Sequence, residues 1–199
     1  MKIRLVFYVV GFLQVCIGLT MALPAWCAWH YGESALEAIL WSMAISIVGG
    51  AAIAALARSD DDIRVREGFA IVTFGWIAAA AFGSLPFMIS GSIPSFTDAF
   101  FETLSGFTTT GASILTDIGS QPLSLLMWRS QTQWLGGMGI IVLSIAILPF
   151  LGVGGMQLFK AEVPGPTPDR LKPRISQTAT LLWAVYLLLT ALAILLLHL

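Results

Sequence analysis

The sequence contains few charged residues, few histidines and few cysteines. Only 11% of its 199 residues are charged, against 57% apolar residues, and its mean hydropathy is +0.88. This balance excludes an ordinary soluble domain, because such a domain carries about 25% charged residues. The net charge of −1 provides no basic patch, so we expect no nucleic-acid partner. The composition predicts an integral membrane protein.

The scarcity of ligating and nucleophilic side chains limits the chemistry that the chain can perform. Cys16 and Cys27 lie in one apolar run without CxxC spacing, and no histidine or carboxylate cluster accompanies them. There is no HExxH motif, and the apolar runs contain no pair of aspartates and no Ser–His arrangement. An intramembrane enzyme is therefore the weakest of the functions considered. We expect neither catalysis nor a covalently bound cofactor.

Long apolar runs make up most of what is present. A helix of about 20 residues crosses a hydrocarbon layer about 30 Å thick. Five stretches reach this length, at residues 5–28, 35–57, 68–89, 123–150 and 178–197. The sequence therefore predicts an all-α integral membrane fold with five transmembrane helices.

The basic residues predict the orientation of these helices, because lysine and arginine beside short loops stay on the cytoplasmic side. Nine of the ten basic residues fall on one side if the five helices alternate in direction. We therefore expect a multi-pass protein whose N-terminus is cytoplasmic. The tenth basic residue, Arg129, lies about two turns inside an apolar run.

A polar interruption separates the third and fourth apolar runs. Pro94 prevents a helix from continuing, and Ser95 with Asp98 three residues later resembles a capping box. We expect a helix at residues 96–107, which at about 18 Å is too short to cross a bilayer. It would be a re-entrant pore helix, and its C-terminal end at the membrane centre would favour a cation.

The residues after this helix, Thr108, Thr109, Thr110 and Gly111, predict a filter strand for a monovalent cation. Their backbone carbonyls can replace the water around K⁺ where a helix stops inside the membrane. Gly111 can adopt backbone angles that turn its carbonyl into a pore. A TTTG sequence by itself is more typical of an extracellular turn. Its position between a short helix and a membrane span favours the filter.

Arg129 needs a partner or water, because an arginine inside the hydrocarbon layer costs several kcal/mol. Our first candidate partner is Glu102 and our second is Asp98, and either pair would brace the pore helix against the following span. The alternative is that Arg129 faces an outer water-filled vestibule and repels cations. The pair is favoured, since intramembrane charges usually pair.

Three glycines interrupt the fourth apolar run, at Gly136, Gly137 and Gly139. Each weakens a helix by about 1 kcal/mol relative to alanine, so we expect a compensating use. Close packing of helices is the favoured explanation, and a hinge is the alternative.

Three ordered blocks of sequence carry a resemblance to a known family. Residues 100–113 read FFETLSGFTTTGAS, residues 128–130 and 133–140 read WRS and QWLGGMGI, and residues 154–166 and 171–175 read GGMQLFKAEVPGP and LKPRI. In these blocks, and over essentially its whole length, the chain resembles the Trk-type potassium uptake proteins of the Trk/Ktr/HKT superfamily.

The resemblance implies a leading helix pair followed by four repeats of span, pore helix and span around one pore. Residues 1–66 would form the leading pair, 67–152 the first repeat, 153–175 a cytoplasmic linker and 176–199 the first span of an incomplete second repeat. The chain would then be the N-terminal part of a potassium uptake protein. In the wider superfamily a serine in the position of Gly111 is associated with Na⁺, so Gly111 indicates K⁺. The alternative is a truncated, non-conducting membrane fragment with a structural or assembly role.

The same resemblance implies location and partners. The location would be the bacterial cytoplasmic (inner) membrane. The partners would be K⁺, the lipid bilayer, the remaining pore-loop repeats, a cytoplasmic nucleotide-binding regulatory subunit of the TrkA type and, in the complete protein, a second copy in a homodimer. Candidate contacts of the regulatory subunit are Lys160, Arg170 and Lys172.

Overall fold

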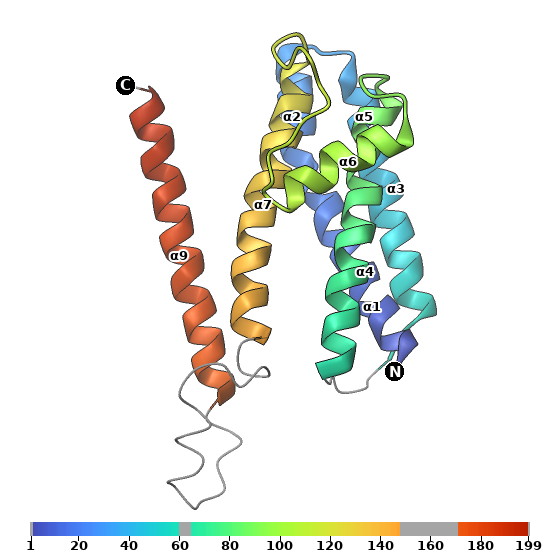
Figure 1. Ribbon diagram of the computed structural model, residues 1–199. Coiled ribbons are helices and arrows are strands. Elements are labelled where there is room, and N and C mark those ends of the chain that lie inside the picture. The colour runs from blue at the N-terminus through green and yellow to red at the C-terminus, as the bar shows by residue number, and fades with distance from the viewer. Residues whose placement is uncertain (1, 60–64, 148–170, 199) are drawn as a thin grey trace, which may run out of the picture. The chain divides into compact units, whose positions relative to one another are not determined.

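Helices make up the regular structure that can be described. The computed structural model describes residues 2–59, 65–147 and 171–198, and contains no β-strand within them. The helices are α1 (Ile3–Thr20), α2 (Ala22–Tyr31), α3 (Ala35–Leu56), α4 (Val65–Gly83), α5 (Leu85–Ile89), α6 (Phe96–Phe107), α7 (Leu123–Ile147) and α9 (Leu171–His198) (Figure 1). The chain divides into two units, Met1–Gly136 and Gly137–Leu199. Each unit is described by itself.

Four helical stretches in the described residues are long and apolar enough to cross a membrane. They are Ile3–Tyr31, Leu36–Leu56, Arg66–Ile89 and Thr180–His198, and they correspond to four of the five predicted spans. The remaining predicted span, 123–150, coincides with the 25-residue helix α7 as far as Ile147. Residues 148–150 lie outside the described residues.

Two of the predicted spans are broken rather than continuous. The first is interrupted at Met21, between α1 and α2, and the third at Ser84, between α4 and α5. A proline follows each break, Pro24 in α2 and Pro86 in α5, and proline lacks the N–H that an uninterrupted helix requires. Both prolines are fully buried.

The last helix begins earlier than the predicted linker allows. The linker was expected to reach residue 175, but α9 starts at Leu171. Pro173 is compatible with this start, because backbone N–H groups in the first turn of a helix have no intrahelical acceptor. Of the candidate regulatory contacts, Lys160 and Arg170 lie outside the described residues, and Lys172 lies in the first turn of α9.

Small residues let α1 and α3 approach closely. Figure 1 shows α1, α3 and α4 as a bundle within the first unit. A Cβ atom added to Gly50 would lie 2.7 Å from the Gly11 carbonyl oxygen, and one added to Gly18 would lie 3.0 Å from the Ser46 Cβ. In a membrane, where water does not drive helices together, such backbone contact provides much of the packing energy.

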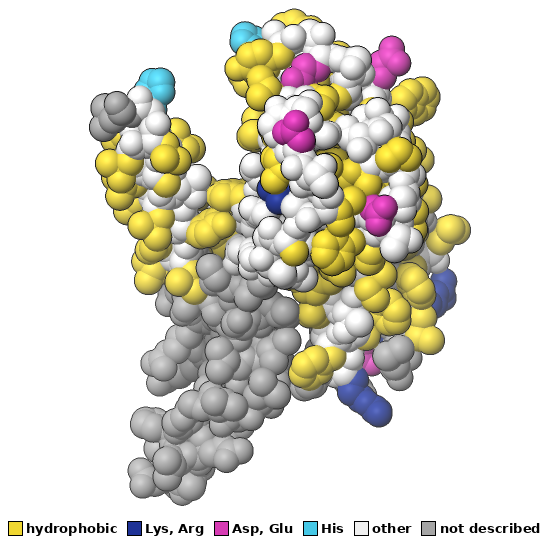
Figure 2. All heavy atoms as spheres, turned by 45° about the horizontal axis from the view of Figure 1, so that its top comes forward, with side chains coloured by type: hydrophobic (Ala, Val, Ile, Leu, Met, Phe, Trp, Pro, Cys, Tyr) yellow, Lys and Arg dark blue, Asp and Glu magenta, His cyan; other side chains and the backbone are white. Residues whose placement is uncertain are grey.

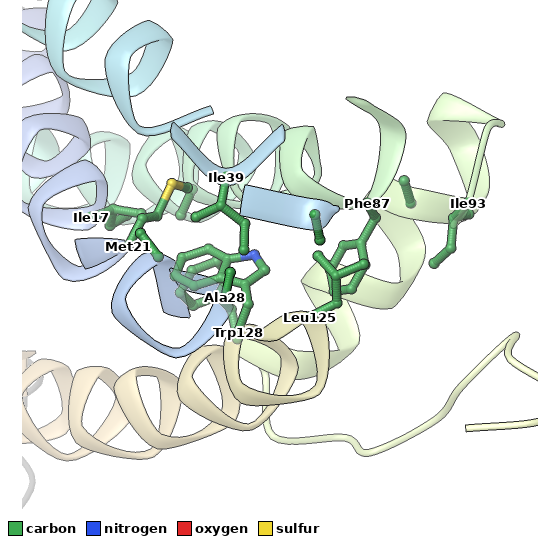
Figure 3. Close-up of a cluster of buried hydrophobic side chains, with 13 residues drawn as sticks. Ile17, Met21, Ala28, Ile39, Phe87, Ile93, Leu125 and Trp128 are labelled. Atoms are coloured by element: carbon green, nitrogen blue, oxygen red, sulfur yellow. The ribbon is translucent and has the colours of Figure 1, made fainter. Parts of the chain in front are cut away.

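The buried core of Met1–Gly136 gathers around Trp128 of α7, which is fully buried. Figure 3 shows its ring beside Met21, Ala28 and Ile39, so that the break between α1 and α2 packs directly against α7. Hydrophobic side chains also cover much of the face that Figure 2 shows. Large hydrophobic residues of the described chain are exposed, Trp41 among them. An apolar exterior suits contact with lipid.

We predict that Gly50→Ala destabilises the protein by about 1–3 kcal/mol, because the new methyl group would meet backbone atoms of α1. Gly68→Ala is the matched control, since nothing lies within 4 Å of the added Cβ at that helical position. The control variant should be as stable as the parent, or more stable by up to about 1 kcal/mol, because alanine favours a helix more than glycine does. Thermal unfolding in detergent micelles measures both, and equal melting temperatures would contradict the packing argument.

Candidate functional site

The short helix expected at residues 96–107 is present with these bounds as α6. Ser95 caps it, and the Ser95 Oγ accepts a hydrogen bond from the Asp98 N–H at 3.5 Å. The helix packs against α4, where a Cβ added to Gly83 would lie 2.8 Å from the Thr103 side chain. The N-cap and this close contact fix where α6 begins and which face it buries.

The Thr-rich segment after α6 directs its N–H groups back into the helix. Thr108 N–H bonds to the Leu104 carbonyl at 2.8 Å, Thr110 N–H to the Ser105 carbonyl at 3.0 Å, and Thr109 N–H to the Gly106 carbonyl at 2.9 Å. Within the described residues, no hydrogen bond ends on the carbonyls of residues 108–111, and these four residues are exposed. The carbonyls are therefore available as ligands.

Two residues of this segment have left-handed backbone angles. Gly111 has a φ of 76°, as expected for glycine, but Thr109 has a φ of 57°. This conformation is an outlier for a β-branched residue and costs about 1–3 kcal/mol. Hydroxyl contacts accompany it, since the hydroxyls of Thr108 and Thr110 lie 2.8 Å apart. Backbone strain of this kind is typical of functional sites.

The predicted filter strand is not a β-strand. The segment continues irregularly from Thr108, without a ladder partner in the described chain. The physical reason is the return of its N–H groups to α6, which leaves none of them for a neighbouring strand.

A buried carboxylate, Glu102, holds the far end of this segment. It is 2% exposed and accepts hydrogen bonds from the Ser113 hydroxyl at 3.0 Å and from the Ile114 N–H at 2.9 Å. Arg129 of α7 completes the set, with its Nε 2.7 Å from the Glu102 Oε1. The structure thus brings together the first predicted pair, while Asp98 lies in the first turn of α6. One carboxylate joins α6, the polar segment and α7.

The end of α6 also packs tightly on α7. A Cβ added to Gly106 would lie 2.3 Å from the Thr132 hydroxyl oxygen, and one added to Gly136 would lie 2.1 Å from the Phe107 carbonyl oxygen. Gly136 therefore lies in close contact with the backbone at the end of α6, and its use for packing, favoured over a hinge, stays a prediction. Gly137 and Gly139 follow it in α7, and their predicted uses stay open.

Residues 36–199 match the family model described as "TrkH: Cation transport protein". The chain belongs to the TrkH family. This agrees with the resemblance in its three sequence blocks, and the four span-length helices together with the family indicate a multi-pass membrane protein.

Several TrkH-family relatives are similar over nearly the whole chain. The Trk system potassium uptake protein TrkH of Salmonella typhimurium (strain LT2) is 44% identical over 193 residues, which is 96% of this chain and 40% of that protein. TrkH of Escherichia coli (strain K12) gives the same identity and coverage. The chain spans about two fifths of the length of these relatives, as expected if it corresponds to their N-terminal part.

A solved structure supports the same fold. The crystal structure of the potassium transporter TrkH from Vibrio parahaemolyticus matches with a TM-score of 0.78 and 38% identity, over 94% of this chain and 37% of that one.

Sequence reasoning missed the contacts of Glu33 that position α7. Glu33, in the loop before α3, accepts hydrogen bonds from the Leu123 N–H at 2.7 Å and the Ser124 N–H at 3.0 Å, and also from the Ser124 hydroxyl. It therefore caps the N-terminus of α7 from 90 residues away. Pro122 signals the start of this helix, but nothing local to the sequence indicates the distant cap.

We predict that Glu102→Gln lowers stability by about 3–5 kcal/mol, because it removes one charge of a buried pair and leaves Arg129 without its counter-ion. Asp98→Asn is the control, since that side chain lies at the exposed start of α6. Thermal unfolding in detergent measures both losses. Equal effects of the two changes would contradict the role of Glu102 as the central acceptor.

Proposed function

We propose that this chain contributes one quarter of a potassium-selective filter, as part of the pore-forming subunit of a Trk-type uptake system in the bacterial inner membrane. The observation that carries the proposal is the backbone of residues 108–111. Their N–H groups bond to carbonyls at the end of α6, while no hydrogen bond in the described chain ends on their own carbonyls, and the four residues are exposed. A dehydrated K⁺ requires such carbonyl ligands.

The surrounding helices support this assignment. As a re-entrant pore helix, α6 would direct the partial negative charge of its C-terminal end toward the segment, which attracts a cation. Glu102 accepts hydrogen bonds from Ser113 and Ile114, just beyond residues 108–111, and its charge is paired with Arg129. Neutral dipoles would thus form the site, as suits a weakly hydrated monovalent ion.

In this proposal α7 is the fourth of five transmembrane helices, and the N-terminus is cytoplasmic. Residues 1–66 are the leading helix pair and 67–152 the first repeat. A linker from residue 153 leads to the second repeat, which starts with α9 at Leu171. The distribution of basic residues supports the orientation. An inside-negative potential would then drive K⁺ inward with about 2.3 kcal/mol per 100 mV.

One segment cannot surround an ion, so three further segments must come from elsewhere in the transporter. The chain's coverage of about two fifths of its relatives is consistent with this need. A homodimer and a cytoplasmic nucleotide-binding subunit of the TrkA type are the proposed assembly partners, and Lys160, Arg170 and Lys172 are the proposed contacts of that subunit.

Potassium-limited growth tests the proposed function. Cells without their own potassium uptake systems should grow at low K⁺ when they express a complete transporter that carries residues 1–199, and should take up ⁸⁶Rb⁺. Absence of both, with the protein present in the membrane, would refute the proposal. The same assay with the 199 residues alone separates a conducting chain from a structural fragment, and we expect no growth from it.

We predict that Gly111→Ser in the complete transporter lowers the preference for K⁺ over Na⁺ by about tenfold or more, equivalent to at least about 1.4 kcal/mol. The added side chain has space, with nothing within 4 Å, but the φ of 76° is strained for serine and the carbonyl would shift. Gly91→Ser is the matched control, because Gly91 has the same φ and equal space outside the segment. Competition of Na⁺ with ⁸⁶Rb⁺ uptake measures the preference. Equal ratios in both variants would count against the filter assignment.

A further inference from the structure

A side chain of α7 donates a hydrogen bond to a backbone carbonyl that has no helical donor at the break between α1 and α2. Pro24 has no N–H, so the Thr20 carbonyl four residues earlier loses the donor that a continuous helix would provide. Gln131 of α7 supplies another, with its Nε2 2.7 Å from the Thr20 oxygen. This hydrogen bond joins residues 111 positions apart.

A second backbone carbonyl without its helical donor also accepts a hydrogen bond from a side chain of α7. At the break between α4 and α5, the Phe87 N–H bonds to the Ser84 carbonyl, which leaves the Gly83 carbonyl without that donor. The indole Nε1 of Trp128 donates to Gly83 at 2.8 Å. Both broken helices are therefore held by side chains of α7.

The two donors share one side of α7. Trp128 and Gln131 are three residues apart and so neighbour each other on the helix surface. Arg129 lies between them in sequence and reaches Glu102 at 2.7 Å. One rotation of α7 about its axis therefore allows the two hydrogen bonds to the carbonyls and also directs Arg129 to Glu102.

We propose that Gln131 is a positioning residue of the ion site. Its bond to the Thr20 carbonyl fixes the rotation and depth of α7, and through Arg129 and Glu102 it sets the position of residues 108–114. The consequence for ion preference rests on the proposed function, whereas the coupling between Gln131 and Glu102 does not. The experiment therefore has one readout for each.

The first readout is ion preference in a complete transporter that carries residues 1–199. Gln131→Met keeps the length of the side chain and removes the donor. We expect the preference for K⁺ over Na⁺ to fall about fivefold, the factor that corresponds to a net hydrogen-bond contribution of about 1 kcal/mol. The melting temperature should also fall, because the Thr20 carbonyl is left partly buried without a partner.

A second change, Pro24→Ala, distinguishes two roles of Gln131: positioning α7, or only donating a hydrogen bond to the Thr20 carbonyl. The alanine introduced by this change would supply an N–H to Thr20 within the helix itself, so the double variant should regain the melting temperature lost in Gln131→Met. It should not regain ion preference, because α7 still lacks its hydrogen bond to the Thr20 carbonyl. Recovery of both would overturn the proposal, and so would an unchanged ion preference in Gln131→Met.

Gln133→Met is the matched control, as a half-buried glutamine of the same helix with no hydrogen bond of its side chain in the described part of the chain. Pro24→Ala should raise the melting temperature of Gln131→Met more than that of Gln133→Met. An equal gain in the two backgrounds would show that Gln131 does not serve the Thr20 carbonyl.

The second readout is a melting-temperature cycle between Gln131→Met and Glu102→Gln, which needs no transport. If Gln131 positions Arg129, then Glu102→Gln should lower the melting temperature at most half as much in Gln131→Met as in the parent. Additive losses would overturn the inference. A parent protein that takes up no K⁺ would refute the proposed function instead, and the cycle would still decide the role of Gln131.

Discussion

The placement of one buried carboxylate constrains the rest of the site. Glu102 is almost completely removed from solvent, and a charge in that position must be neutralised and hydrogen-bonded. Arg129 supplies the charge, while Ser113 and Ile114 supply further donors. Because these groups come from α6, α7 and the segment between them, satisfying one side chain fixes three elements. The tight contacts of Gly106 and Gly136 are the apolar part of the same junction.

The junction leaves the segment before Ser113 with an unequal use of its two backbone groups. Its N–H groups donate hydrogen bonds to carbonyls of α6, whereas its own carbonyls at residues 108–111 accept none in the described chain. The fold itself therefore does not depend on these acceptors. The positive φ of Thr109 is part of that arrangement, and the cost of this angle is carried by the surrounding contacts. A structural loop could satisfy both kinds of group more simply. In the proposed function these acceptors are ligands of K⁺.

Local signals in the sequence were sufficient for part of this picture. Pro94 and Ser95 correctly predicted where the short helix begins. The energetic cost of an intramembrane arginine led to Glu102 as the first candidate partner of Arg129. The breaks at Met21 and Ser84 were not predicted, because the apolar pattern continues through both. The filter strand was predicted from carbonyl ligation of a cation after a short helix, and the return of the N–H groups to α6 has no sequence signature. The distant contacts of Glu33 and Gln131 depend on tertiary structure.

The cap that Glu33 provides for α7 has a consequence for the order in which the protein is made. Chains are synthesised and inserted from the N-terminus, and early segments fold before later ones exist. Glu33 accepts hydrogen bonds from a helix that begins 90 residues later, so α1 to α3 can be assembled while α7 is still untranslated. When α7 emerges, its unpaired N–H groups meet a carboxylate already in place. Helices α1 to α3 can thus act as an internal template for the insertion of α7.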